Sequence, residues 1–337
     1  MKKTMDKKKL ARVIATWLVT GIMVSVFLLD IVTVVLANNY TSAVTLTSGK
    51  SEKSDSADRI HFLNTANSDC IILESNGHFA MIDSGEGDTN PRKKTEYKGF
   101  TEEVMAYLEE HATSSDGKIH LDFILATHMH YDHAGNFETI IRSEKVVIDK
   151  AYIKEYTDDD FSETEKIGWG NQELYTAIIT ALNEKEVPIT HDLPTEEFTF
   201  GDFNLRLLNT VTPDEIKVEG DNDNSIGVIV KKGEDSAFLA ADFTNSNGIE
   251  EYYADDIGDI DLLKMGHHGY FGSSSADFLR TLKPEIAICT NYIGKIYPNV
   301  KWNITMVAKA PIFSTVHRNG IIATFTGNGI TLTENIM

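Results

Sequence analysis

The stretch Thr127-His-Met-His-Tyr-Asp-His-Ala-Gly-Asn136 holds three histidines and an aspartate within residues 128–133. It directly follows Leu121-Asp-Phe-Ile-Leu-Ala126, an apolar run that predicts a buried strand. Loops at strand ends present functional groups on a rigid base. Imidazole and carboxylate are zinc ligands, and a His-x-His pair in a tight loop can direct two rings at one ion. These four residues therefore predict a metal site, whereas a polar turn explains only one of them.

The chain from residue 59 onward alternates short apolar runs with a few helical patterns. Three such runs, separated by turn residues, predict a meander of strands: Ile60–Leu63, Cys70–Glu74 and Phe79–Asp83. Ser162-x-x-Glu165 has the pattern of a capping box that opens a helix. Strands interleaved with helices indicate a mixed α/β layered fold with helices on the outer faces. No stretch has the composition of a linker, so we predict one domain over residues 59–337.

The motif His-x-His-x-Asp-His resembles the signature of the metallo-β-lactamase superfamily. That family has an acidic residue after a later strand, and then another histidine. Here Ala237-Phe-Leu-Ala-Ala-Asp242 ends on a carboxylate, and Leu262-Leu-Lys-Met-Gly-His-His-Gly269 carries two histidines. Three separated blocks agree in order and in local structure, which makes the resemblance specific. It implies a four-layer αββα sandwich, preceded here by one N-terminal transmembrane helix.

The resemblance also implies two zinc ions per chain. The first would be bound by two histidines, the second by the Asp-His pair and a late histidine, and Asp242 would bridge them. The implied ligands are His128, His130, Asp132, His133, Asp242 and His268. Asp132 would hold the nucleophile's proton and His267 would act on the leaving group. The opposite assignment of His267 and His268 stays open.

One histidine of the family pattern has no clear counterpart. His191 is the only histidine between the first motif and Asp242, and its place after Pro188 indicates a surface residue. We therefore expect three protein ligands at the first zinc. Candidates for supporting or substrate-binding roles lie near the motifs or in stretches that could face the site: Asp69, Asp83, Asn224, Lys264 and Trp169.

Within the superfamily, the likeness is to the subgroup that includes the hydrolase domain of ComEC-type DNA-uptake proteins. It is greatest to bacterial cell-wall phosphorylcholine esterases, in Glu74-Ser-Asn-Gly-His-Phe-Ala-Met-Ile-Asp83, His133-Ala-Gly-Asn136 and Trp169-Gly-Asn171. The resemblance implies a phosphodiesterase in which a metal-bridging hydroxide attacks a small-molecule or cell-wall phosphoester. The alternatives are an extracellular nuclease, a lactamase-type amide hydrolase and a non-catalytic binding module.

The charge of the domain argues against a nucleic-acid substrate. The whole chain has a formal charge of −20, but residues 38–337 carry 25 basic and 49 acidic side chains, a net charge of −24. Most nucleic-acid affinity comes from neutralising phosphates with Lys and Arg. A surface this acidic repels a polyanion, so nucleic acid is an unlikely partner.

The N-terminus has the pattern of a membrane anchor. Residues 1–12 are a basic tail, which the positive-inside rule places in the cytoplasm. Residues 13–37 are almost all apolar and predict a single transmembrane signal-anchor, with the catalytic domain outside the cytoplasm. Cleavage after Ala37 is the alternative and would give a secreted protein. Residues 38–58 are rich in Ser, Thr, Lys and Asp and predict a flexible spacer.

Overall fold

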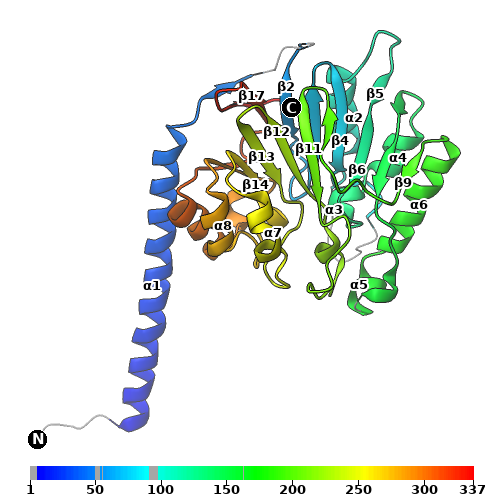
Figure 1. Ribbon diagram of the computed structural model, residues 1–337. Coiled ribbons are helices and arrows are strands. Elements are labelled where there is room, and N and C mark those ends of the chain that lie inside the picture. Colours follow the sequence, from blue (N-terminus) through cyan, green and yellow to red (C-terminus); the bar gives the residue numbers. More distant parts are fainter. Residues whose placement is uncertain (1–5, 50–53, 55, 91–97, 162) are drawn as a thin grey trace, which may run out of the picture.

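The computed structural model describes residues 6–49, 54, 56–90, 98–161 and 163–337. Figure 1 shows two β-sheets packed face to face, with helices over the outer face of each. The predicted four-layer αββα sandwich of the metallo-β-lactamase type is therefore confirmed. The predicted N-terminal apolar helix is also present, as the long helix α1.

The first sheet has nine strands in the order β1-β18-β17-β2-β3-β4-β6-β8-β9. Strands β2, β3 and β4 pair antiparallel, which confirms the predicted meander. Strands β4, β6, β8 and β9 then run parallel. The strands are β1 (Leu46–Ser48), β2 (Asp58–Phe62), β3 (Cys70–Ser75), β4 (His78–Ser84), β6 (Phe123–Ala126), β8 (Ala151–Ile153), β9 (Ile189–Thr190), β17 (Ile321–Phe325) and β18 (Ile330–Glu334).

The second sheet has seven strands in sequence order, antiparallel up to β13 and parallel from β13 to β16. They are β10 (Phe198–Phe200), β11 (Phe203–Leu208), β12 (Gly227–Lys232), β13 (Asp235–Leu239), β14 (Leu262–Lys264), β15 (Ile286–Cys289) and β16 (Ile312–Ser314). A small parallel pair, β5 (Ile119–Leu121) and β7 (Val146–Ile148), lies apart from both sheets.

The outer layers are helical. Helices α2, α4 and α6 cover the first sheet, and α7, α8 and α9 cover the second. The helices are α1 (Lys7–Thr41), α2 (Thr101–His111), α3 (Tyr131–Ala134), α4 (Phe137–Arg142), α5 (Glu163–Gly168), α6 (Asn171–Glu184), α7 (Ile249–Ile257), α8 (Ala276–Leu282) and α9 (Pro298–Trp302). Short helical turns are η1 (Asp158–Asp160), η2 (Asp221–Asn224), η3 (Gly266–Gly269), η4 (Ile293–Lys295) and η5 (Asn303–Ala308).

Both sheets are buried on their two faces, and the side-chain alternation of the strands explains the layering. In β12, Val228 and Val230 point into the apolar core between the sheets, whereas Ile229 packs under the outer helices. Successive side chains of a strand point to opposite faces, so apolar residues at consecutive positions require cover on both. The outer helices supply that cover.

The prediction of a flexible spacer over residues 38–58 is wrong in part, because some of these residues form regular structure. Helix α1 continues to Thr41, and Leu46–Ser48 form β1, which pairs parallel with the C-terminal strand β18. The polar composition hid this strand, because Leu46 is the only large apolar residue within it. Residues 50–53 and 55 of the predicted spacer lie outside the described residues, as does Ser162 of the predicted capping box.

Candidate metal centre

The site lies where strands of the two sheets end side by side. Strands β4 and β6 are parallel neighbours in the first sheet, as are β13 and β14 in the second. The His-x-His-x-Asp-His loop follows β6, Asp242 follows β13, and the Gly-His-His-Gly turn follows β14. The three motifs found in the sequence therefore meet at one edge of the sandwich.

A hydrogen-bonded turn holds the first motif in place. The amide and hydroxyl of Thr127 donate to the two carboxylate oxygens of Asp83, over 2.8 and 2.7 Å. Asp83, the second-last residue of β4, has a left-handed φ of 54°. The main chain of Met129 donates to Asp221 at 2.5 Å. The start of the loop is thus fixed to carboxylates of two other segments.

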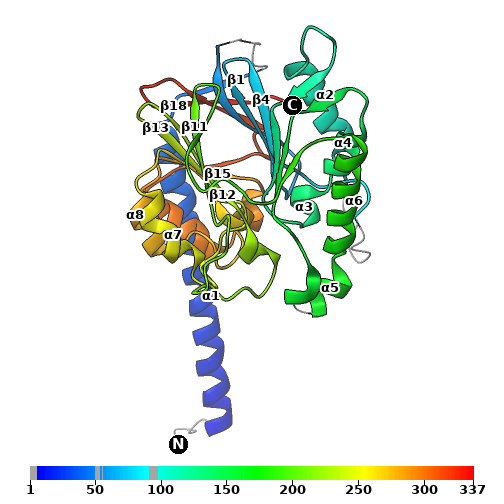
Figure 2. The ribbon, with the colours of Figure 1, turned by 45° about the vertical axis from the view of Figure 1, so that its right-hand side comes forward.

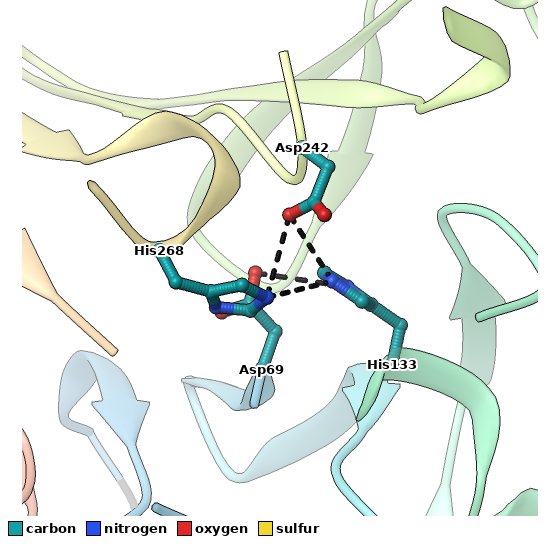
Figure 3. Close-up of side chains that lie close together, drawn as sticks. All are labelled: Asp69, His133, Asp242 and His268. Carbon is teal, nitrogen blue, oxygen red and sulfur yellow. Dashed lines mark hydrogen bonds and ion pairs between the residues drawn. The ribbon is translucent and has the colours of Figure 1, made fainter. Parts of the chain in front are cut away.

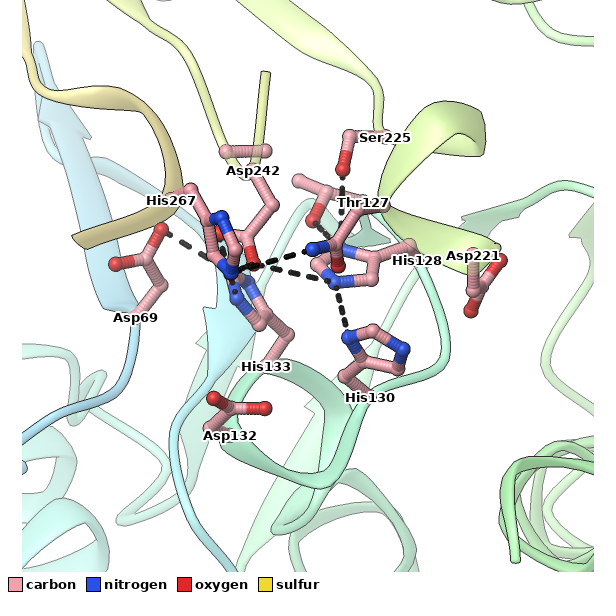
Figure 4. A network of polar contacts seen from close by, with 12 residues as sticks. Asp69, Thr127, His128, His130, Asp132, His133, Asp221, Ser225, Asp242 and His267 are labelled. Atoms are coloured by element: carbon pink, nitrogen blue, oxygen red, sulfur yellow. Dashed lines mark hydrogen bonds and ion pairs between the residues drawn. The ribbon is translucent and has the colours of Figure 1, made fainter. Parts of the chain in front are cut away.

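Two histidines and a carboxylate form what we call the open group: His128, His130 and Asp242. His128 Nε2 lies 3.1 Å from His130 Nδ1 and 3.8 Å from Asp242 Oδ2. The ligand atoms of these three buried residues lie within 4.8 Å of one another. Figure 4 shows the rings of His128 and His130 converging below Ser225 and beside Asp242.

The second cluster, which we call the closed group, contains Asp69, His133, Asp242 and His268. His133 Nε2 lies 3.1 Å from His268 Nε2 and 3.1 Å from Asp242 Oδ1. All four side chains are buried. Figure 3 shows them pointing toward one another from four different segments. Asp242 belongs to both groups through its two oxygens.

The donor set fits two metal ions. In each group, two imidazole nitrogens face each other at 3.1 Å beside a carboxylate oxygen. Unprotonated nitrogens at that distance direct lone pairs into one space, which a cation stabilises. Nitrogen and carboxylate donors together suit zinc and other transition metals. The predicted metal-binding chemistry is thus supported by two buried His/Asp clusters.

Each imidazole of the closed group has a carboxylate behind it. His133 Nδ1 lies 2.7 Å from Asp83, and His268 Nδ1 lies 3.2 Å from Asp69 and 3.0 Å from the Thr290 hydroxyl. Burial lowers the pKa of His133, but Asp242 and Asp83 outweigh that effect and hold it well above its usual value. Carboxylates in this position orient a ligand imidazole and make it a better donor.

The open group has a different environment. His128 Nδ1 faces only hydroxyls, those of Thr127 at 3.1 Å and Ser225 at 3.4 Å. Burial and the neighbouring histidines lower the pKa of His128 well below its usual value. His130 Nε2 lies 3.0 Å from Glu165, and its ring packs on Trp169 with 4.5 Å between centroids. A pocket opens above His130, lined also by Trp169, His267 and Phe271, among others.

The turn after β14 places two adjacent histidines on different sides of Asp242. His267 and His268 both have left-handed φ values, of 45° and 50°. Such backbone costs about 1–3 kcal/mol per residue and is found where surrounding structure enforces it. Gly266 permits the turn, since a Cβ there would lie 2.3 Å from the carbonyl oxygen of Phe243. The strain separates the two side chains.

His268 faces the closed group, whereas His267 lies toward the pocket. His267 Nε2 is 3.8 Å from Asp242 Oδ2 and 3.3 Å from the Asn222 amide nitrogen, and its side chain is 27% exposed. Asp132 lies beside the closed group, 3.7 Å from His268 Nε2, with its side chain 15% exposed. Asp132 thus approaches the His268 nitrogen that faces His133, whereas Asp69 contacts the opposite nitrogen, Nδ1, which fits the supporting role that the sequence gave it.

Three further residues considered from the sequence lie away from the facing imidazoles of the two groups. Lys264 is fully buried, forms an ion pair with Asp69 and donates to the Ala241 carbonyl at 2.8 Å. It therefore holds the Asp69 carboxylate in place. Asn224 lines a separate cavity with Lys154 and His191. His191 lies 2.8 Å from the Ile153 carbonyl through Nδ1 and belongs to neither cluster. Of the two roles considered for Lys264, its contacts favour support of Asp69, and it does not line the pocket.

Three supporting residues were not predicted from the sequence: Glu165, Thr290 and Asp221, which accepts a hydrogen bond from the Met129 amide. Glu165 was assigned to a capping box, yet its carboxylate contacts His130 and accepts from the Asp221 amide at 2.9 Å. Thr290 bridges His268 and Asp69, to which its hydroxyl donates at 2.6 Å. Burial raises the pKa of Asp221 to about 6. For Glu165 the signal in the sequence was an acidic residue four positions before Trp169. For Thr290 it was a threonine directly after an apolar strand pattern.

With this geometry in view, comparison with known proteins settles the family. A sequence model described as the metallo-β-lactamase superfamily matches residues 63–290. The chain belongs to the metallo-β-lactamase superfamily. Members of this superfamily are generally metal-dependent hydrolases, and the buried His/Asp clusters lie within the matched residues.

Two curated relatives within the superfamily are similar at low identity. ComE operon protein 3 of Bacillus subtilis is 25% identical over 240 residues, which cover 64% of this chain and 28% of that protein. Recombination protein 2 of Haemophilus influenzae is 23% identical over 216 residues, covering 64% and 22%. The ComEC-type likeness is therefore confirmed. The chain spans about a quarter of the length of these relatives.

Two solved structures are more distantly similar. The metallo-β-lactamase fold protein YhfI from Bacillus subtilis has a TM-score of 0.45 at 12% identity, covering 76% of this chain and 96% of that one. CmlA, a diiron β-hydroxylase from Streptomyces venezuelae, has a TM-score of 0.40 at 15% identity, covering 75% and 48%.

Proposed function

We propose that this chain is a membrane-anchored, dinuclear-zinc phosphodiesterase that acts outside the cytoplasm on cell-surface phosphoesters. The observation that carries the proposal is the pair of clusters sharing Asp242, one closed and one adjoining an open pocket. Paired metals suit phosphoester hydrolysis because they can clamp the attacking and leaving oxygens together. When bound, such ions also lower the pKa of a coordinated water to about 7.

The residues of the chain divide the remaining work. His128, His130, Asp132, His133, Asp242 and His268 are the proposed ligands. His267 lies beside Asp242 on the pocket side, where it can donate a proton to a leaving oxygen. Trp169 and Phe271 form apolar walls of the pocket and exclude water from a bound ester. Asp132, partly exposed next to His268, can hold the proton of the nucleophile.

Phosphorylcholine-type esters are the proposed substrates within that class. The likeness to phosphorylcholine esterases is carried by sequence motifs, and Trp169 is one of the residues in them. Its ring lines the pocket beside His130, where an aromatic face attracts a quaternary ammonium group. The net charge of −24 over residues 38–337 also favours a substrate that carries a cationic choline group over a polyanion.

Helix α1 is the proposed anchor. The described chain contains one helix long and apolar enough to cross a membrane, at Lys7–Val32, and none of its most apolar window is buried. Basic residues precede it, which favours a cytoplasmic N-terminus and an outer catalytic domain. A signal peptide passes the same test, and cell fractionation distinguishes the two: the anchor keeps the full-length chain in the membrane.

The first experiment is a comparison of four substrates with and without a chelator. These are p-nitrophenylphosphorylcholine, bis-p-nitrophenyl phosphate, single-stranded DNA and nitrocefin. We expect chelator-sensitive turnover of the two phosphodiesters, with preference for the choline ester. Preference for DNA would favour the nuclease alternative, which the likeness to the ComEC-type relatives supports in part. Preference for nitrocefin would favour an amide hydrolase, and no turnover of any substrate would contradict the proposal.

A further inference from the structure

The pocket lies at the end of the domain that faces along α1 toward its N-terminus. Figures 1 and 2 differ by a turn about the vertical axis, so heights in the two views can be compared. In both, α5 forms the lower end of the domain, and the N-terminal half of α1 continues downward past the domain. Glu165 of α5 and Trp169 just after it line the pocket. The pocket therefore lies at the end of the domain toward which the N-terminal half of α1 extends.

The domain is fixed to α1 near the outer end of the span. Lys301 of α9 forms an ion pair with Asp30 of α1 at 3.0 Å, and its side chain is only 12% exposed. Both α9 and η5 also pack against α1. Asp30 lies two residues before the end of the apolar span at Val32. A bilayer that holds α1 therefore has its outer surface close to α9.

Exposed apolar side chains connect α9 to the pocket mouth. Tyr297, which caps α9, is 44% exposed, and its ring centroid lies 5.9 Å from that of Phe271. Phe271 lines the pocket and is 67% exposed, while Ile167 of α5, two residues before the pocket residue Trp169, is 82% exposed. Phe271 and Tyr297 are thus ring neighbours, and Ile167 is linked to the same pocket through Trp169. Large exposed apolar side chains around one pocket mark an interaction surface. We call Ile167, Phe271 and Tyr297 the apolar rim.

We propose that the apolar rim docks on the outer surface of the bilayer that holds α1, and that the site takes its phosphoester from lipid headgroups there. The membrane is the occupant because the rim continues, through Tyr297 and α9, into the contact with the anchor. Tyrosine and other aromatic residues are favoured at the membrane–water interface. The inference rests on the proposed anchor and on the proposed phosphoester hydrolysis. It adds that the substrate is part of a bilayer rather than a dissolved ester.

The charge of the domain specifies the kind of surface. With a net charge of −24 over residues 38–337, an anionic bilayer would repel the domain. Docking must then be driven by apolar contact, which a zwitterionic surface permits. We therefore expect docking to phosphatidylcholine vesicles and a weaker contact once anionic lipid is added at low salt.

Fluorescence quenching tests the docking without any need for turnover. The full-length chain is reconstituted in phosphatidylcholine vesicles, with an environment-sensitive label on Ile167→Cys or Tyr297→Cys. The matched control is Glu234→Cys, exposed in the β12–β13 turn at the end of the sandwich opposite the site. Cys70 and Cys289 do not compete for label, since both are fully buried and burial raises the pKa of each thiol.

We expect spin-labelled lipids to quench the label at 167 and 297 and to leave it unquenched at 234. Equal quenching at all three positions, or none at 167 and 297, would overturn the docking. In a second measurement, Ile167→Glu should lower the ratio of vesicle-borne to soluble phosphodiester turnover about tenfold. An unchanged ratio would also overturn it. Intact quenching without turnover of any phosphoester would count against the proposed function alone.

Discussion

The open and closed groups share Asp242 and use the same residue types, yet the protein supports them differently. In the closed group each imidazole has a buried carboxylate behind it, Asp83 for His133 and Asp69 for His268. In the open group one imidazole has such a carboxylate, Glu165 behind His130, whereas His128 Nδ1 faces the hydroxyls of Thr127 and Ser225. The ring of His130 also borders the pocket. Because outer carboxylates strengthen imidazole ligands, we expect the closed group to hold its metal more tightly.

The comparison also shows how environment alone divides identical side chains. Burial lowers the pKa of His133, but Asp242 and Asp83 raise it by more and hold it well above its usual value. The pKa of His128, five residues earlier in the loop after β6, is depressed by burial and by neighbouring histidines. The closed group is built to fix an ion, whereas the open group is built to leave room beside one. The open group adjoins the pocket, so we expect a substrate to enter there.

The largest expected effect comes from removing the carboxylate that the two groups share. Asp242→Asn should lower metal content at both groups and reduce phosphodiester turnover by more than about 100-fold, because it supplies an oxygen to each. Metal analysis and steady-state kinetics measure this. The matched control is His191→Asn, which lies outside both groups and should behave as wild type. Equal losses in the two variants would mean that His191 is the missing ligand.

The next effect separates the adjacent histidines. His268→Asn should remove the closed-group metal, since its Nε2 lies 3.1 Å from that of His133. His267→Asn should keep both metals and lower kcat by about 100-fold, as expected on losing a general acid. Metal stoichiometry beside kcat decides this. Metal loss in His267→Asn would place that residue among the ligands of the open group instead.

A smaller effect tests the supporting carboxylates one group at a time. Asp83→Asn should weaken the tighter of two metal-binding steps by about 10–100-fold, and Glu165→Gln should weaken the other. Chelator competition followed by metal release resolves the two steps. If both variants weakened the same step, the division into open and closed groups would be incorrect.

The smallest effect should lie outside the site altogether. Burial lowers the pKa of His111, which stacks on Tyr107 at 4.2 Å, to about 4. A depressed histidine pKa means that the neutral form stabilises the fold fully above about pH 6.5, and this contribution is lost as the pH falls toward 4. His111→Phe should remove about 1–2 kcal/mol of that acid sensitivity.

Urea unfolding of the metal-free protein at pH 7.5 and pH 4.5 measures the difference. Metal-free protein is used so that metal release by protonated ligands does not add to the slope. His78→Phe is the matched control, since its ring is about half exposed. The same pH slope in wild type and His111→Phe would show that acid sensitivity arises elsewhere, for instance in the site itself.

The motifs themselves were readable because ligand chemistry and strand ends are local properties of sequence. Residues 128–133, Asp242 and His268 follow apolar runs, and each run became a strand that ends at the site. The spacer was less predictable. Leu46–Ser48 look polar by themselves, and only pairing with the distant strand β18 makes them a strand. Edge strands depend on a partner far along the chain, which local patterns do not reveal.

The sequence alone determined the superfamily, the layered α/β fold, the apolar N-terminal helix and the set of metal-ligand candidates. Tertiary structure decided which side of Asp242 each late histidine faces, because that depends on two left-handed residues in one turn. It also decided that Lys264 pairs with Asp69 and that Glu165 reaches His130. These contacts join segments far apart in the chain, and long-range packing selects them, whereas local periodicity and ligand spacing do not.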